Sequence, residues 1–420
     1  MIAGGATGRQ APRIFYGWWV VAGSVVGVSV GSAQFAFGSL GLFITPLGTE
    51  FGWSRTAISL ALTIFTVAQA LAAPVIGHLI DRFGTRRVLL PSLLTYAILL
   101  ASIPMLLAHL WQLFLIFFLI GSLATGAGFI PYVRTINAWF DRRLGLALGV
   151  TMAGGGLGFV YVPPFVQYFI DTSGWRAGYY GLVCLIMLAF PVIYMLFRES
   201  PADMGLSRDG QEAASVTVDS GEVSGLTRAA AIGDRNFWLL FLVFAMLAFC
   251  LYGVFPHLVP MLMDRGMSGA HAALVAATLG FSMVAARAGV GYLIDRYFAP
   301  YVAVPCFILS ALGLGLLATG AIGWLAFVAA ALIGLSAGAE FDLLAFLTRR
   351  YFGLSSYGEI YGLLFVAFLI GTSLGPIAYG AIFDLTGAYF WILAICTLIV
   401  VIAGVIMAFM PRYPALTRQE

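Results

Sequence analysis

The chain contains twelve apolar stretches, each long enough to cross a membrane as a helix. One helical span needs about 20 predominantly apolar residues, because the hydrocarbon core of a bilayer is about 30 Å thick. Backbone groups inside lipid must be hydrogen-bonded within the protein, so long apolar stretches of this kind form helices. We predict an all-α membrane protein with these spans: Trp18–Ile44, Thr56–Leu79, Val88–Ala108, Trp111–Asn137, Leu144–Ile170, Ala177–Phe197, Phe237–Met263, Ala270–Ile294, Tyr301–Thr319, Trp324–Thr348, Tyr357–Phe383 and Tyr389–Met410.

Composition agrees with a membrane protein and argues against several other classes. Charged residues make up 9% of the 420 residues, whereas soluble domains carry about 25%. The net charge of +3 is spread over short loops, so we expect no nucleic-acid partner. We find no nucleophile–base pair or metal-ligand spacing, so we predict no enzymatic activity, cofactor or metal. The isolated cysteines predict no disulfide: Cys184, Cys250, Cys306 and Cys396.

A polar segment divides the chain in two. Residues 198–235 are rich in Ser, Gly, Asp and Glu, which is typical of a flexible linker. We predict one six-helix bundle in residues 1–197 and a second in residues 236–420. All 21 basic residues are arginine; with the N-terminus inside, sixteen are cytoplasmic and three are outside. Positive residues concentrate on the cytoplasmic side, so we expect a multi-pass protein of the cell (inner) membrane with both termini in the cytoplasm.

The two halves repeat one another. The run GHLIDRFG at Gly77 matches GYLIDRYF at Gly291, at an offset of 214 residues. Pro163 and Asp171 match Pro376 and Asp384 at an offset of 213. Repeats of this kind predict two similar bundles with a substrate site between them, an architecture for alternating access.

The run from Gly77 to Arg87, GHLIDRFGTRR, closely resembles the signature between the second and third spans of the major facilitator superfamily. This resemblance implies a twelve-helix transporter. An aspartate in this loop can cap a helix end and pair with arginines, which would latch the two halves when the cytoplasmic side is closed. The alternative is simple anchoring of the loops by positive charge. The residues that we expect in the latch are Asp81, Arg82, Arg86, Arg142, Asp295 and Arg296.

Two further runs resemble the monocarboxylate transporter family. One is Tyr16-Gly-Trp-Trp at the first span, and the other is the stretch from Trp139 to Gly154 entering the fifth. A more distant resemblance is to the oxalate:formate antiporter, whose span-eight arginine stands at the spacing of Arg287 from the loop aspartate. These similarities imply a carrier for small organic anions.

Arg287 lies inside the apolar eighth span and is the main candidate for binding substrate. An arginine in lipid costs about 3 kcal/mol on insertion scales, so it is retained chiefly where it faces protein or a water-filled cavity. We predict that Arg287 binds the carboxylate of a small anion. Glu340 and Asp342 lie at about the same depth in the tenth span. A structural ion pair with one of them is the alternative.

The resemblance also shows departures from the family pattern. Related mammalian-type carriers have an aspartate one turn before the span-eight arginine and a lysine near the end of the first span, where this chain has Met283 and, nearest, Gly38. We therefore predict that an acid of the tenth span carries the proton. Asp342 is the more favoured wall residue, with Glu340 packed against a neighbouring helix, and the reverse assignment stays open. The oxalate:formate antiporter has a lysine in span eleven where this chain has Phe368, and one fixed charge instead of two favours a monoanion.

Five further polar residues are candidates for contacting substrate. His257 lies where Gly253, Pro256 and Pro260 are expected to interrupt the seventh span, and a structural role is equally consistent with the sequence. Arg134 is either a second anion contact, a cytoplasmic gate residue or a residue that reaches to the membrane interface. The remaining candidates are Tyr132, Asn137 and Gln34.

Together these features predict a proton-coupled symporter of a small monocarboxylate, lactate- or pyruvate-like, that works in lipid as a monomer. The alternatives are an organic-anion exchanger and, from a different class, a membrane sensor that binds the anion without moving it. A proton-coupled drug exporter fits less well, because the basic site favours anions.

Overall fold

A computed structural model describes residues 15–210, 225–294, 296–353 and 355–413. In these residues twelve helical spans are long and apolar enough to cross a membrane, as predicted. Ten are single helices: α3 (Arg55–Phe83), α4 (Thr85–Leu106), α7 (Leu144–Ser173), α8 (Trp175–Leu196), α10 (Arg235–Asp264), α11 (Gly269–Ile294), α12 (Ala299–Ala318), α13 (Trp324–Phe352), α14 (Tyr357–Thr386) and α15 (Phe390–Ala408). Short helices accompany the linker: η2 (Pro201–Met204), η3 (Arg208–Gly210) and α9 (Arg228–Gly233).

The other two spans are broken. The first consists of α1 (Gly17–Ser29) and α2 (Ser32–Phe51), because Gly31 between them has extended backbone angles. The fourth consists of α5 (Leu110–Leu123), the 3₁₀ turn η1 (Ala124–Ala127) and α6 (Phe129–Trp139), again with extended angles at a glycine, Gly128. Such irregular backbone is tolerated at membrane depth where it is buried in protein.

The predicted interruption of the seventh span was wrong. Helix α10 is continuous from Arg235 to Asp264, and Gly253, Pro256 and Pro260 all lie within it. Proline within a membrane helix removes one backbone hydrogen bond, and neighbouring helices can satisfy the freed groups. Gly253 serves packing instead, since a Cβ there would lie 2.6 Å from the ring of Tyr379 on α14.

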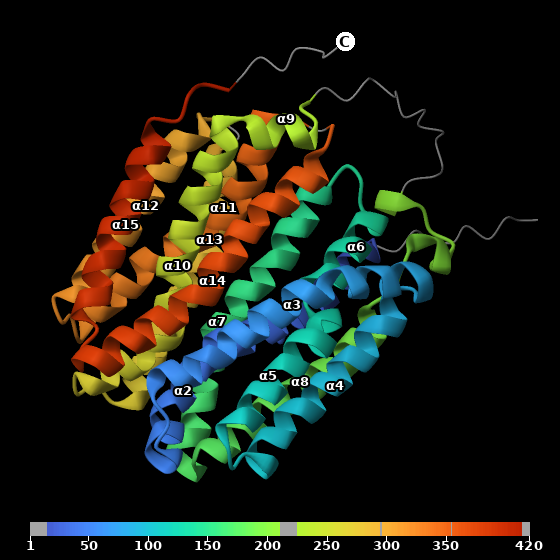
Figure 1. Ribbon diagram of the computed structural model, residues 1–420. Helices are drawn as coiled ribbons and strands as arrows, with labels where there is room; N and C mark the ends of the chain where they lie inside the picture. Colours follow the sequence, from blue (N-terminus) through green and yellow to red (C-terminus); the bar gives the residue numbers. More distant parts are fainter. Residues whose placement is uncertain (1–14, 211–224, 295, 354, 414–420) are drawn as a thin grey trace, which may run out of the picture.

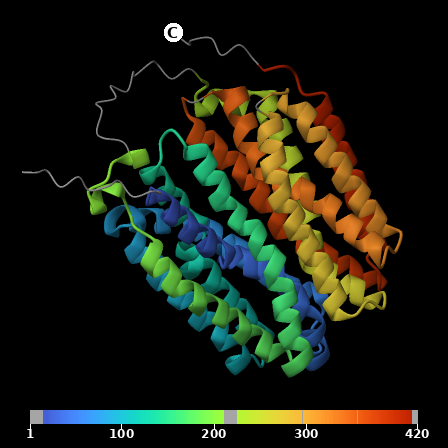
Figure 2. The ribbon, with the colours of Figure 1, turned by 180° about the vertical axis from the view of Figure 1, so that it is seen from behind.

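The halves of the molecule meet chiefly through three helix pairs: α3 with α14, α7 with α11, and α2 with α10. Figure 1 shows the start of α3 against the end of α14, far from the linker, and Figure 2 shows α7 beside α11 from behind. We call the end of the molecule that holds Arg55, Asp264 and Asp384 the distal end. Among the described residues, every side-chain hydrogen bond or ion pair between residues 15–197 and 235–413 comes from α3, at Arg55, Thr56, Ser59 or Thr63.

Candidate functional site around Arg287

Close packing of α11 against α13 positions Arg287. Gly334 and Gly338 of α13 lie against the backbone of α11: a Cβ on them would approach the carbonyl oxygens of Leu279 and Met283 at 2.2 and 2.3 Å. The two glycines, and the two residues they face, are each one helical turn apart, so both helices run in the same direction. Asp342 and Arg287 each stand one turn further along these parallel helices, and therefore at about the same level.

The electrostatics agree with this register. The charges of Asp342 and Arg287 lie within interaction range of each other, and Tyr361 of α14 is within range of both. Asp342 and Arg287 are half-buried. Among the described residues the two do not form an ion pair within 4.0 Å, and the buried Nε of Arg287 has no hydrogen-bond partner. The guanidinium is therefore near a carboxylate without being held by it.

Glu340 has a different environment. Its side chain is fully buried, and within the described part of the chain neither carboxyl oxygen has a hydrogen-bond partner. It lies within electrostatic range of Cys250 and Tyr252 on α10. An ionised carboxylate without partners is very costly to bury, so this environment suits the neutral acid.

Aromatic side chains form a wall beside Arg287. The guanidinium carbon lies 5.9 Å from the ring centroid of Phe341, which is 4.8 Å from that of Phe368. Tyr252 packs edge-on against Phe368 at 5.0 Å and against Phe37 of the N-terminal half at 5.5 Å. Phe368, the position that departs from the oxalate:formate antiporter, thus belongs to this wall. The site combines one basic group with apolar surface from both halves.

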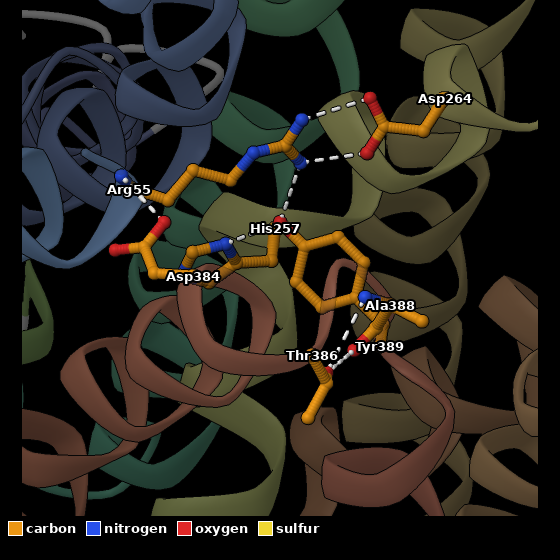
Figure 3. A network of polar contacts seen from close by, with 7 residues as sticks. All are labelled: Arg55, His257, Asp264, Asp384, Thr386, Ala388 and Tyr389. Atoms are coloured by element: carbon orange, nitrogen blue, oxygen red, sulfur yellow. Dashed lines mark hydrogen bonds and ion pairs between the residues drawn. The ribbon is translucent and has the colours of Figure 1, made fainter. Parts of the chain in front are cut away.

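His257 lies away from this wall, in the distal contact between the halves. Its ring is fully buried. Nδ1 is 2.9 Å from the hydroxyl of Tyr389, and Nε2 is 2.9 Å from the carbonyl oxygen of Pro376 and 3.1 Å from the hydroxyl of Ser59 (Figure 3 shows the Tyr389 contact). Contact of His257 with substrate remains a prediction.

The other four substrate candidates lie in the N-terminal half and are not gathered at one point. Gln34 lies at the break in the first span, with its amide facing Gly155. Tyr132 is buried against Gly27, and its hydroxyl has no partner among the described residues. Asn137 is exposed and donates to Val133 of its own helix at 2.8 Å. The fourth candidate, Arg134, forms an ion pair with Asp81.

The predicted latch residues do not meet across the two halves in this conformation, as far as the described residues show. Asp81 pairs with Arg134, which was predicted for substrate, inside the N-terminal half. The other members contact local partners: Arg82 lies over Phe83, Arg86 over Tyr194, and Arg296 over Tyr292, while the backbone of Arg142 donates to Asp209. Asp295 lies outside the described residues. The latch remains a prediction for the opposite conformation.

Sequence reasoning missed two groups of residues. The aromatic wall was not predicted, because aromatic residues are abundant in membrane helices and their number carries no positional information. Phe341 could have been found, since it stands between Glu340 and Asp342. The partners of Arg55 at the distal end were also missed. Asp264 directly follows an apolar span, and this position could have identified it as a charged residue at the end of a membrane helix.

Comparison with known proteins places this geometry in a family. The sequence matches the family model of the Major Facilitator Superfamily over residues 26–376. The chain belongs to the major facilitator superfamily. It is thus a multi-pass membrane transporter protein, in agreement with the resemblance drawn from the loop motif.

Individual proteins show which transporters the chain is similar to. Monocarboxylate transporter 11 of Mus musculus is 28% identical over 418 residues, covering 94% of this chain and 88% of that protein. Monocarboxylate transporter 2 of Homo sapiens is 25% identical, covering 93% and 84%. The crystal structure of a bacterial homolog to the human lysosomal transporter Spinster matches with a TM-score of 0.66 at 18% identity, covering 94% and 97%, and this likeness shows the fold alone.

Proposed function

We propose that this chain is a secondary active transporter that carries a small monocarboxylate, lactate- or pyruvate-like, together with a proton by alternating access. The observation that carries the proposal is the environment of Arg287: a guanidinium with a buried, unpartnered Nε among the described residues, beside Phe341. Planar guanidinium matches a carboxylate in two parallel hydrogen bonds. The names of the relatives support a carboxylate substrate.

The aromatic wall supports a single carboxylate. A dianion would bring its second charge against Phe341, Phe368 and Tyr252, whose rings offer no positive partner. Burying a charge without a partner is costly, whereas a short alkyl or keto group gains by contact with the wall. The structure therefore favours a small monoanion over a dicarboxylate.

Asp342 is the proposed coupling residue. It lies opposite Arg287 on the parallel helix α13 and competes with the substrate for the guanidinium. Protonation of Asp342 removes this competitor, so proton and anion bind together and the pair crosses the membrane without net charge. Glu340 faces α10 and is proposed to stay neutral in this conformation.

Uptake of labelled lactate into proteoliposomes, with and without an inward proton gradient, tests the proposal. Symport predicts gradient-driven accumulation that an ionophore abolishes. Uptake that ignores the gradient but requires an internal anion would replace symport by exchange. Binding of carboxylates without uptake would favour the sensor. Failure to bind any carboxylate would overturn the role of Arg287.

A further inference from the structure

The contact at the distal end has an unusual component: an aspartate from one half caps a helix of the other half. The carboxylate of Asp384, near the end of α14, accepts hydrogen bonds from the backbone N–H groups of Arg55 at 3.2 Å and Thr56 at 2.9 Å, and from the Thr56 hydroxyl. These N–H groups belong to the first turn of α3, which has no partners for them in its own helix. Negative charge there also complements the helix dipole.

The side chain of Arg55 reaches in the same direction, so that the two halves hold each other reciprocally. Its guanidinium makes two contacts of 2.8 Å with the carboxylate of Asp264, at the end of α10. It donates to the hydroxyl of Tyr389 at 2.7 Å and lies 3.7 Å from the ring centroid of Phe383. All these partners come from the C-terminal half, and Figure 3 shows the contacts with Asp264 and Tyr389. Only 14% of the Arg55 side chain is exposed, against 35% of the Asp264 side chain, so the arginine is the shielded member of this pair.

A buried layer continues the contact along α3. The Tyr389 hydroxyl lies between the guanidinium of Arg55 and Nδ1 of His257. Because that hydroxyl accepts from Arg55, its own proton goes to Nδ1 of His257, and Nε2–H of His257 donates to the Pro376 carbonyl. One turn further, Thr63 donates to the carbonyl of Ser373. The polar positions of α3 recur every three or four residues, so they form one helix face.

The pseudo-symmetric position in the other half lacks this cap. Asp171 of α7 corresponds to Asp384 at an offset of 213 residues, and Gln167 corresponds to Gly380 at the same offset. Gly380 lets the backbone of α3 approach so closely that an added Cβ would lie 2.8 Å from the nitrogen and Cα of Thr56. Gln167 instead donates its amide to Asp171 at 2.7 Å and occupies the space beside Gly269 of α11. Among the described residues Asp171 makes no hydrogen bond to the other half.

We propose that Gly380 and Asp384 form a one-sided gate at the distal end, in which α14 caps α3 and must release it before this end can open. The residue four positions before each aspartate decides whether the cap forms. Gly380 leaves room for α3 to approach the carboxylate of Asp384. Gln167 instead fills the corresponding space and donates a hydrogen bond to the carboxylate of Asp171. Opening therefore breaks charged contacts at α3–α14 but none of this kind at α7–α11.

Thiol labelling of a buried reporter tests the gate. Val259 is 4% exposed and lines a small cavity between α2, α7, α10 and α11. In a Val259→Cys, Cys184→Ser background, purified protein is treated with a water-soluble maleimide, without substrate. We expect Asp384→Asn to raise the labelling rate on the order of tenfold, since loss of a helix cap shifts an equilibrium by this magnitude. Asp171→Asn, its matched control, leaves the rate unchanged.

A second variant acts through shape and not through charge. Gly380→Ala places a methyl group against the backbone of α3 and also raises the rate, whereas Gly362→Ala on the same helix has open space and does not. It decides the question if Asp384→Asn fails to fold. Rates for both variants equal to those of their controls would overturn the gate. Because the assay contains no carboxylate, its outcome is independent of the proposed transport function.

Discussion

At the scale of single residues, the level at which Asp342 stands beside Arg287 follows from two glycines of α13, one and two turns before Asp342. Gly334 and Gly338 bring α13 into backbone contact with α11, and this contact fixes which acid faces the guanidinium. Glu340, two residues earlier, points about 200° away on a helix. If α13 lay further from α11, neither Asp342 nor Glu340 would be close enough to interact with the charge of Arg287.

Arg287→Lys tests whether the guanidinium binds the substrate in a bidentate manner. Lysine keeps the charge but loses the planar pair of donors. We expect the Kd for lactate to rise on the order of tenfold, as measured by calorimetry or by tryptophan fluorescence. Arg235→Lys, at the exposed start of α10, is the control and leaves Kd unchanged. A variant with unaltered affinity would mean that Arg287 is a structural residue.

Asp342→Asn and Glu340→Gln separate the two acids of the tenth span. Asparagine cannot take up the coupling proton, so we expect gradient-driven accumulation to be lost while exchange of labelled for unlabelled anion continues. Glutamine resembles the neutral form of Glu340, so accumulation continues in that variant. The opposite result would assign coupling to Glu340, and normal accumulation in both variants would exclude the tenth span from coupling.

At the scale of helices, the sequence predicted where spans lie better than how they are built. Long apolar stretches identify spans because lipid imposes their length, and all twelve were found. Breaks depend instead on which backbone groups find partners in neighbouring helices. Proline was therefore misleading in α10, whereas the actual breaks fall beside Gly31 and Gly128. For the same reason, candidates in the broken spans, such as Gln34 and Tyr132, could not be placed relative to Arg287 from spacing alone.

Glycines of α7 set how closely the broken first span can pack. A Cβ on Gly154 would lie 2.5 Å from the carbonyl oxygen of Val25 on α1. We expect Gly154→Ala to lower the thermal unfolding temperature of the purified protein, because α1 has to move away. Gly149→Ala on the same helix meets open space and is neutral or stabilising by up to about 1 kcal/mol. Equal melting curves for the two variants would contradict this account.

At the scale of the whole molecule, the internal repeat in the sequence predicts two related halves but not the differences between them. The matched aspartates Asp171 and Asp384 have different partners, because the residues four positions earlier differ. Residues that match between the two halves of the sequence reveal their pseudo-symmetry. Residues that differ beside them, such as Gln167 and Gly380, determine where the two halves make different contacts.

Orientation in the membrane gives a prediction at this scale. We expect the linker to face the cytoplasm, as the arginine distribution indicates. In a Cys184→Ser background, an impermeant thiol reagent should label Thr49→Cys in intact cells and Ala202→Cys only after the membrane is opened. Both positions are exposed in the structure. Labelling in the reverse order would invert the topology.

The proposed gate at the distal end has a pharmacological consequence. In the proposed gate, the contacts of Arg55 and Asp384 hold α3 and α14 together and so oppose entry of a compound from that side. Such a compound would reach the site around Arg287 only during the part of each transport cycle in which the gate is open. Blockade from that side would accordingly be use-dependent: weak at rest, deepening with turnover, and faster in onset on a carrier with alanine at position 380.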